Sequence, residues 1–190
     1  MPARIVVTEF ASLDGVMQAP GGEDFKYPGW SFEFDRGDDG NDFKLEETRR
    51  ADALLLGRTT YESFAGAWPN REGEFAEKLN AMPKFVVSTT LKDPEWNNTT
   101  VLGSGDATAQ VRKLKAEFDG ELQVPGSHRL VQELIESDLV DQINLMVFPV
   151  ILGTGKRALE ETPERRTLRL RESKVVGDGV LVLIYERAAD

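Results

Sequence analysis

The chain has 190 residues, the size of one domain, since hydrophobic cores usually divide only above about 250 to 300 residues. Its 33 acidic and 23 basic residues give a net charge of −10, which argues against broad contacts with nucleic acid or an anionic membrane. The absence of cysteine excludes a disulfide framework and fits a protein of the reducing cytoplasm. Neither a secretory signal nor a spanning helix is expected. We therefore expect a single cytoplasmic domain, residues 1–190, that acts on a small molecule.

Strand-like and helix-like patterns alternate in the first part of the chain. Residues 4–10 are rich in β-branched residues and predict a strand, which is followed by the turn signal Asp14-Gly15. Residues 16–35 contain proline, glycine and aromatic residues and predict a long loop, of a length that is often functional. A helix is expected at 40–50, and the continuous apolar run 51–57 predicts a strand that is covered on both faces.

The same alternation continues to the C-terminus. Helices are expected at 75–82 and at 106–118 with Asp106 as N-cap, strands at 84–90 and 141–152, a strand-turn-helix unit at 121–138, and a hairpin around Gly177-Asp178-Gly179 at 167–187. This order predicts an α/β fold, with a mixed, mostly parallel sheet flanked by helices and a C-terminal antiparallel hairpin.

One strand end has a pattern typical of an anion site. The apolar run 51–57 ends at Gly57, and Arg58, Thr59 and Thr60 follow where a helix is expected to begin. The N-terminus of a helix presents free backbone N–H groups and a partial positive charge at the carboxyl edge of such a sheet. Arg58 would add a guanidinium suited to phosphate, and the threonines would cap the helix or donate to an oxygen. Alternatively, Thr59 only caps the helix and Arg58 is a solvated surface charge.

Two other strand ends add to this signal. Ser88 and Thr89 follow a predicted strand, and their hydroxyls could bind a ribose or phosphate or could satisfy backbone groups of a turn. Gly126 and Ser127 connect a predicted strand to a helix, and Gly126 could bring main-chain N–H groups to a pyrophosphate. Three such ends on one sheet predict a dinucleotide site. The fingerprint G-x-G-x-x-G is absent, which disfavours an ordinary Rossmann domain.

Taken in order, these motifs resemble the dihydrofolate reductase superfamily. They are SLDG after the first strand, LLLGRTTYESF, KFVVST, GSHRLVQEL, LVDQINLMVFPVILGTGKR and the final hairpin, and together they span nearly the whole chain. The closest resemblance is to the reductase domain of bacterial riboflavin biosynthesis and its stand-alone relatives. It implies a dihydrofolate reductase-like three-layer fold and an NADPH-dependent reductase of a small heterocycle, similar to 5-amino-6-(5-phosphoribosylamino)uracil reductase. The alternatives are a dihydrofolate or pteridine reductase and a non-catalytic nucleotide-binding protein that kept the fold.

The resemblance also implies a role for each strand end. The segments that hold the adenosine phosphate side of NADPH correspond to Gly57, Arg58, Thr59 and Thr60 and to Ser88 and Thr89, and the segment beside the pyrophosphate corresponds to Gly126 and Ser127. Because NADPH and NADH differ by a 2′-phosphate, we expect Arg58 to select NADPH. Pro125 departs from the glycine-rich loop of relatives and removes one N–H donor. His128, as the single histidine, indicates neither a metal site nor a catalytic triad, and we expect no metal.

The sequence assigns a proton donor less directly than a cofactor site. Asp14 follows the first strand near the place expected for the nicotinamide and is a candidate catalytic acid, although Asp-Gly is also an ordinary turn. The true dihydrofolate reductases place a substrate-holding acid near the start of the helix before the second strand. Five acids lie in the corresponding region, where they could equally form a solvated face, and the sequence does not choose among them: Asp38, Asp39, Asp42, Glu46 and Glu47.

Apolar residues lead to two more expectations. Trp30 and Phe32, in the long loop, are predicted to pack over the nicotinamide or substrate as a cover, or alternatively to attach the loop to the domain. The strands at 141–152 and 180–187 have more apolar surface than one helix layer needs to cover, and members of the family commonly pair. We therefore expect a homodimer, unless this surface lies in the core of the monomer.

Overall fold

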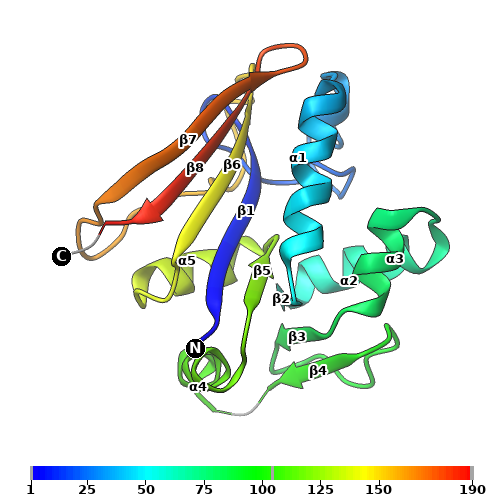
Figure 1. Ribbon diagram of the computed structural model, residues 1–190, viewed down its shortest axis with the longest axis vertical. Coiled ribbons are helices and arrows are strands. Elements are labelled where there is room, and N and C mark those ends of the chain that lie inside the picture. The colour runs from blue at the N-terminus through cyan, green and yellow to red at the C-terminus, as the bar shows by residue number, and fades with distance from the viewer. Residues whose placement is uncertain (1, 104, 189–190) are drawn as a thin grey trace.

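The fold is a three-layer α/β arrangement around one eight-stranded sheet, seen in a computed structural model that describes residues 2–103 and 105–188. The strands are β1 (Arg4–Ser12), β2 (Ala53–Gly57), β3 (Lys84–Val87), β4 (Thr99–Leu102), β5 (Glu121–Val124), β6 (Gln142–Phe148), β7 (Leu168–Val176) and β8 (Val180–Arg187). Their order across the sheet is β4-β3-β2-β5-β1-β6-β8-β7 (Figure 1). All neighbours are parallel except β6–β8 and β8–β7, so the predicted mixed, mostly parallel sheet with a C-terminal antiparallel hairpin is confirmed.

Helices cover both faces of the sheet because its central strands are apolar on both sides. The helical segments are η1 (Trp30–Glu33), α1 (Gly37–Arg50), α2 (Arg58–Ala67), η2 (Trp68–Asn70), α3 (Glu74–Ala81), α4 (Ala107–Glu117) and α5 (His128–Glu136). In β2, Leu55 packs in the core beneath α4 and α5, whereas Leu54 and Leu56 pack against α2 and α3 on the opposite face. Phe43 of α1 extends this second layer over β6 and β8. Residues that alternate along one strand thus build two separate cores.

Most of the predicted elements are present, with three corrections. The edge strand β4 was not expected, because it has only four residues and none of them is buried. The strand expected at 141–152 ends at Phe148, where Pro149 provides no N–H for further pairing. The strand expected at 84–90 likewise ends at Val87, because the hydroxyl-bearing residues that follow form a turn. The N-cap of α4 is confirmed, since the Asp106 side chain accepts from the N–H groups of Thr108 and Ala109.

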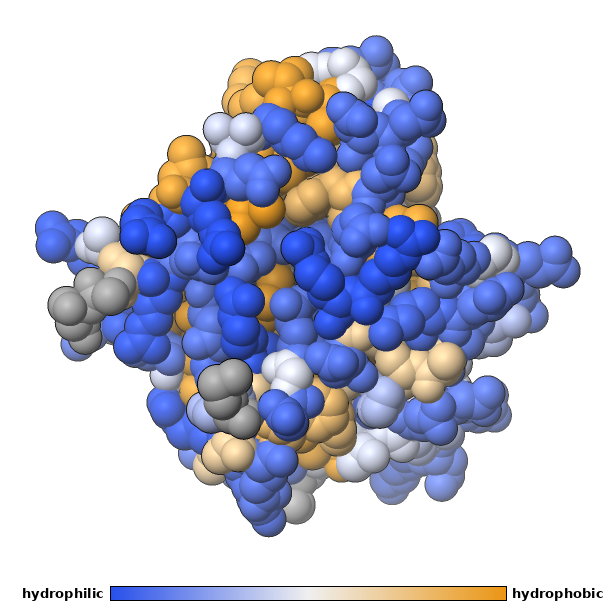
Figure 2. Space-filling model, in the orientation of Figure 1, coloured by the Kyte–Doolittle hydropathy of each residue, from blue (hydrophilic) through white to orange (hydrophobic). Residues whose placement is uncertain are grey.

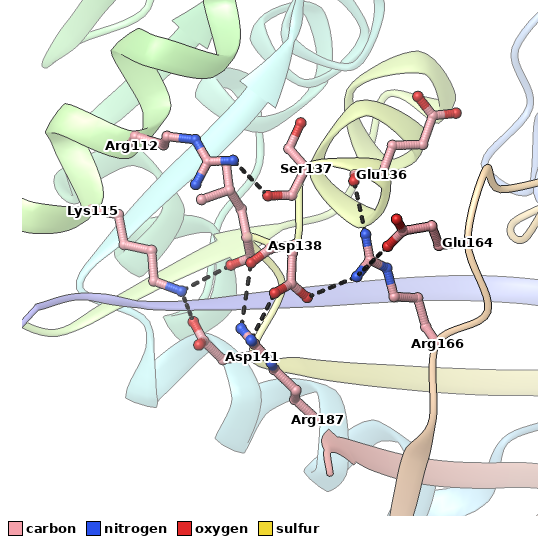
Figure 3. Close-up of polar contacts among 10 residues, drawn as sticks. Arg112, Lys115, Glu136, Ser137, Asp138, Asp141, Glu164, Arg166 and Arg187 are labelled. Atoms are coloured by element: carbon pink, nitrogen blue, oxygen red, sulfur yellow. Dashed lines mark hydrogen bonds and ion pairs between the residues drawn. The ribbon is translucent and has the colours of Figure 1, made fainter. Parts of the chain in front are cut away.

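The parallel strands begin at one edge of the sheet, which we call the amino edge, and a network of ion pairs occupies it (Figure 3). Lys115 at the end of α4 lies 2.5 Å from Asp141, which also accepts a hydrogen bond of 2.8 Å from the backbone N–H of Ile5 at the start of β1. Asp138, after α5, pairs at 2.6 Å with Arg187 at the end of β8 and at 3.7 Å with Arg166. The charges at this edge therefore attach helix ends to strand ends.

No helix in the described part of the chain combines the length and the apolar character needed to cross a membrane. The same residues contain no group of three or more His, Asp or Glu side chains placed to hold a metal ion.

Candidate functional site

The parallel strands end at the carboxyl edge, and there two connections leave the sheet in opposite directions. From β2 the chain enters α2 on one face, and from the neighbouring β5 it enters α5 on the other. In open α/β sheets, ligands bind outside the strand ends at such a topological switch point. The strand β1 is paired with β5 only as far as Val7, so Thr8 to Ser12 continue past the end of β5. Side chains of this part of β1 therefore lie beside the β5–α5 connection.

The predicted cofactor residues of α2 and of the β5–α5 connection are in direct contact. The N–H of Gly57 donates to the carbonyl of Gly126 at 3.2 Å, and the N–H of Thr60 donates to Ser127 Oγ at 3.3 Å. A Cβ added to Gly57 would lie 2.3 Å from Ser127 Oγ, and one added to Gly126 would lie 2.8 Å from Thr60 Oγ1. Neither position has room for a side chain. The structure thus brings together segments far apart in sequence, which we call the strand-end site: Gly57, Arg58, Thr60, Gly126 and Ser127.

The helix ends at the strand-end site have the properties of an anion site. The N-cap residues, Gly57 of α2 and Ser127 of α5, make no side-chain cap hydrogen bond to their own helices, and Ser127 Oγ instead accepts from the N–H of Thr60 in the first turn of α2. Thr59 is exposed and does not cap α2, which argues against the first part of the alternative interpretation. The peptide bond between Gly126 and Ser127 is cis. Backbone N–H groups and two helix dipoles therefore converge on one position.

Arg58 adds a positive charge at the rim of this site, but its guanidinium group is already paired with a carboxylate. Its side chain is 51% exposed, and its Nη1 lies 3.2 Å from Oε1 of Glu62, one turn later in α2. Such a solvent-exposed pair stabilises a helix only weakly and can open to accept another anion. The position of Arg58 fits the predicted contact with a phosphate. Glu62 would compete with that phosphate for the guanidinium group.

Ser88 and Thr89 follow β3, beside the start of α2, because Val87 pairs with Gly57 in the sheet. Ser88 is buried, and its Oγ accepts hydrogen bonds of 3.2 Å from the N–H of Thr90 and 2.9 Å from the N–H of Leu91. The Ser88 hydroxyl therefore supports a turn, which was the alternative to its contact with a ribose or phosphate. Thr89, the next residue, is exposed, so a ligand can reach its side chain.

A buried acid lies against the strand-end site and was not singled out in the sequence. Glu9 of β1 is only 6% exposed, and its Oε1 has no hydrogen-bond partner within residues 2–103 and 105–188. This oxygen lies 3.8 Å from the point where a Cβ on Gly126 would be. Burial raises the pKa of Glu9 well above its ordinary value, while the charge of Lys44 opposes the increase. In the sequence, Glu9 is the acid of a strand that is rich in apolar residues, RIVVTEFAS, and this pattern does not show what its side chain contacts.

The carboxylate of Asp14 is held by hydrogen bonds from the end of β1 and from the segment after β6. Its carboxylate accepts from Ser12 Oγ at 2.6 Å and from the backbone N–H groups of Leu152 at 3.1 Å and Gly153 at 2.9 Å. The hydrogen bond from Ser12, together with those from the two backbone groups, lowers the pKa of Asp14 to about 2. A carboxylate with this pKa carries no proton near neutral pH. The geometry therefore favours the turn interpretation of Asp14 over a role as proton donor.

The two aromatic residues predicted as a cover differ in their surroundings. Trp30 is 1% exposed, its ring lies edge-on to Phe148 at 5.4 Å, and its Nε1 donates to the carbonyl of Gln18. This packing attaches the loop to the domain and favours that alternative over a cover role for Trp30. Phe32 is 71% exposed and stays a candidate for the cover.

Among the five acids near α1, the structure distinguishes Glu47. Its side chain is 2% exposed. The carboxylate accepts hydrogen bonds from Thr8 Oγ1 and, at 2.6 Å, from Asn144 Nδ2, and it forms an ion pair of 2.5 Å with Lys44. Its bonding capacity is used within the protein, which indicates a structural role. Lys44 and Arg36 both lie 5.3 Å from the ring centroid of Phe10, so two cations border the end of β1 on the α1 face.

His128 occupies the first turn of α5, as expected for a residue without a metal or triad role. Its Nε2 lies 3.0 Å from Oε1 of Glu160, in the segment before β7. This contact connects α5 with a loop on the same face of the sheet and involves none of the residues of the strand-end site.

The architecture and the strand-end site can now be compared with known proteins. The family model described as the RibD C-terminal domain matches residues 3–182. The chain belongs to this family. Two uncharacterized proteins of Bacillus subtilis (strain 168) are similar to it along nearly their whole length: YwjB, 30% identical over 190 residues, with 99% of this chain and 100% of YwjB covered, and YyaP, 25% identical over 187 residues, with 96% and 94% covered.

Solved structures support the same fold for this RibD C-terminal domain. A Shewanella sp. PV-4 protein named for riboflavin biosynthesis has a TM-score of 0.74 at 21% identity, with 100% of both chains covered. A pyrimidine reductase-like protein of Corynebacterium diphtheriae has a TM-score of 0.63 at 13% identity, over 99% of this chain and 93% of its own. Dihydrofolate reductase from Enterococcus faecalis, in complex with NADP(H), has a TM-score of 0.60 at 15% identity, with 98% and 97% covered. The dihydrofolate reductase-like fold of the chain is thereby confirmed.

Proposed function

We propose that the protein is an NADPH-dependent reductase that transfers a hydride to a small heterocyclic substrate. The observation that carries this proposal is the contact between the start of α2 and the Gly126–Ser127 connection, which places the N-termini of α2 and α5 next to each other at the carboxyl edge. A dinucleotide with a pyrophosphate and a further phosphate suits such a site, because helix N-termini and Arg58 provide local positive charge in a chain whose overall charge is −10. The complex of the Enterococcus faecalis neighbour with NADP(H) adds support.

Several residues fit the cofactor. The Gly126–Ser127 backbone would lie against the pyrophosphate, because no side chain can occupy the space beside Thr60. Arg58, Thr59 and Thr89 would contact the 2′-phosphate and the adenosine side, where they are exposed at neighbouring strand ends. The nicotinamide, when bound, supplies the hydride, so the protein has to bind and orient both reactants and exclude water.

The substrate proposed is a pyrimidine that carries a ribose phosphate, as in 5-amino-6-(5-phosphoribosylamino)uracil. Arg36 and Lys44 border Phe10 at the end of β1, so a ring could pack on Phe10 while a cation faces an anionic substituent. Phe32, exposed on η1, would cover the reactants. The names of two structural neighbours, one pyrimidine reductase-like and one for riboflavin biosynthesis, support this class over a folate.

The test is NADPH oxidation with a panel that contains the ribosylaminopyrimidine, dihydrofolate and several pterins. We expect loss of NADPH absorbance with the pyrimidine and little with the folate. Oxidation with a pterin alone would move the assignment to a pteridine reductase. Cofactor binding without oxidation by any member of the panel would contradict the proposed activity and favour a nucleotide-binding protein.

We also propose that two copies associate through the C-terminal hairpin. Leu170, Val175 and Leu181 are 48%, 66% and 37% exposed, and Val175 pairs with Leu181 across the hairpin. In Figure 2, hydrophobic residues gather at the upper left, over β7 and β8, on a face that is otherwise mostly hydrophilic. Association would cover this surface and the free edge of β7. Light scattering at micromolar concentration should give the mass of a dimer, and Leu181→Lys should give that of a monomer; a monomeric parent protein would refute the proposal.

A further inference from the structure

Glu9 is placed where an ionised acid should be unfavourable. It belongs to the same face of β1 as Ile5 and Val7, which lie in the core beneath α4 and α5. Its position past the end of β5 brings its carboxyl group beneath Gly126, with Oε1 enclosed and without a hydrogen-bond partner. A phosphate bound at the strand-end site and an ionised Glu9 would be two like charges across one layer of backbone.

The charged groups around Glu9 do not neutralise it directly. On α1, Lys44 is held on the opposite face of the sheet by Thr8 Oγ1 at 2.7 Å and by Glu47. On α2, Arg58 is paired with Glu62. On α5, His128 is paired with Glu160. Lys44 and Arg58 each have a carboxylate of their own, so the charge of Lys44 offsets the effect of burial on Glu9 only in part, and the surroundings favour the neutral form of Glu9.

On this basis we propose that Glu9 makes cofactor binding depend on protonation: its neutral acid form permits a phosphate-bearing dinucleotide at the strand-end site, and its carboxylate form opposes it. The inference rests on the proposed function, because it takes the ligand to be a nicotinamide dinucleotide. It adds a residue of β1 to a site otherwise built from α2 and the β5–α5 connection. The raised pKa of Glu9 agrees with the geometry.

The proposal has a direct thermodynamic consequence. If the cofactor binds only when Glu9 is protonated, its dissociation constant rises by up to about tenfold for each pH unit above the pKa of Glu9. Binding in that range also takes up a proton from the buffer. If Glu9 only supports the fold, its substitution should change the affinity for the cofactor by the same factor at every pH. Cofactor binding to the parent would then take up no proton.

The experiment compares the parent protein with Glu9→Gln by titration calorimetry between pH 5 and pH 9.5. NADH is used beside NADPH, because the 2′-phosphate of NADPH titrates near pH 6 and NADH lacks it. The amide cannot ionise, so Glu9→Gln should bind as the parent does where Glu9 of the parent is protonated, more tightly than the parent above the pKa of Glu9, and without the steep pH dependence. Buffers of different ionisation enthalpy should report proton uptake for the parent and none for the variant.

Glu62→Gln is the matched control, because it removes an exposed acid near the same site. It should raise affinity by a similar factor at each pH and keep the pH dependence of the parent. A pH dependence that persists in Glu9→Gln would overturn the proposal. The infrared carbonyl band of a protonated carboxyl, present in the ligand-free parent and lost in Glu9→Gln, tests the neutral form without any cofactor. If no nicotinamide cofactor binds but the band is present, the proposed function fails and the protonation of Glu9 stands; if the band is missing, the inference itself fails.

Discussion

The two edges of the parallel sheet use polar groups in opposite ways. At the amino edge, Lys115, Asp138 and Asp141 each pair with a charge or backbone group of another element, and the pairs connect α4, β6 and β8 (Figure 3). At the carboxyl edge, α2 and α5 begin without side-chain caps and Glu9 is buried without a partner for Oε1. The amino edge pairs its charged groups within the chain, whereas the carboxyl edge leaves Glu9 Oε1 without a partner among the described residues and supports the first turn of α2 through Ser127 Oγ of another connection.

This difference follows from what each edge has to do. Polar groups that are already satisfied hold elements together and have little to offer a ligand. Groups that are buried without partners reduce stability, and proteins retain them mainly where function needs them. The comparison predicts that substitutions at the amino edge reduce stability and leave binding unchanged, whereas those at the carboxyl edge change binding more than stability.

The largest effect is expected from Gly57→Ala. The added methyl group would lie 2.3 Å from Ser127 Oγ and 3.0 Å from the backbone nitrogen of Ser127, so α2 and the β5–α5 connection must separate. We expect cofactor affinity to fall by about 100-fold or more, with a loss of stability of about 1–3 kcal/mol from overpacking. Calorimetric titration with NADPH and thermal unfolding would measure the two effects.

Gly66→Ala is the matched control for this substitution. Gly66 lies in the same helix, is exposed, and has no atom within 4 Å of an added Cβ. Alanine should stabilise the helix by about 0.5–1 kcal/mol there and leave cofactor affinity unchanged. Unchanged affinity in a folded Gly57→Ala protein would show that the close approach of the two segments does not shape the site.

At the amino edge, Asp141→Ala should have the opposite profile. It leaves Lys115 without its ion-pair partner and the N–H of Ile5 without its acceptor. We expect a loss of about 2 kcal/mol in the free energy of unfolding, or roughly 4–8 °C in Tm, and a change in cofactor affinity of less than about twofold. Asp141→Asn keeps an acceptor for Ile5 and should lose less. A large loss of affinity in either variant at 25 °C would contradict the separation of the two edges.

The sequence predicted most of this fold because its central strands are strongly apolar and are separated by glycine, proline and hydroxyl signals. Local patterns could not predict the edge strand β4, whose four residues are partly exposed and pair only with β3. They also placed the start of α1 too late, since Gly37-Asp38-Asp39-Gly40 is typical of a turn and becomes helical only in contact with the β7–β8 hairpin.

The candidate site was predicted in part. Strand ends followed by glycine and hydroxyl residues indicated Gly57, Thr60, Gly126 and Ser127, and the structure brings these residues together. Glu9 could not be recognised, because its importance depends on β1 continuing past the end of β5, a matter of sheet register. The sequence left two roles open for Trp30, because its packing against Phe148 of β6 is a long-range contact that no local pattern reveals.

Arg58→Ala should affect binding less than Gly57→Ala, because Arg58 is half exposed and shared with Glu62. A hydrogen bond to a charged group contributes about 1.5–3 kcal/mol, and solvent and the competing acid favour the low end, so we expect about a tenfold loss for NADPH. NADH should change much less. Added salt should weaken NADPH binding in the parent more than in the variant. Equal losses for both cofactors would place Arg58 at the shared pyrophosphate instead.

A pH-dependent effect concerns the stability of the carboxyl edge itself. The pKa of Glu9 is raised in the folded protein, so between its ordinary value and the folded value the native state binds more protons than the unfolded state. The free energy of unfolding contributed by Glu9 therefore falls as pH rises through that window, and the loss is complete above the folded pKa. Glu9→Met, of similar size and without a charge, does not have this loss.

The variant should accordingly differ little from the parent near pH 4.5 and become more stable than the parent as pH rises, by about 1.4 kcal/mol for each pH unit up to the pKa of Glu9 in the folded protein. Since all other ionisable groups are common to both proteins, the difference between their Tm values at each pH isolates Glu9. Because the substitution also removes the carboxylate that would oppose a bound phosphate, cofactor affinity in the variant should not fall as pH rises through the same window. A Tm difference that does not vary between pH 4.5 and pH 8 would mean that Glu9 does not titrate there, and the contrast between the two edges would then rest on the helix ends alone.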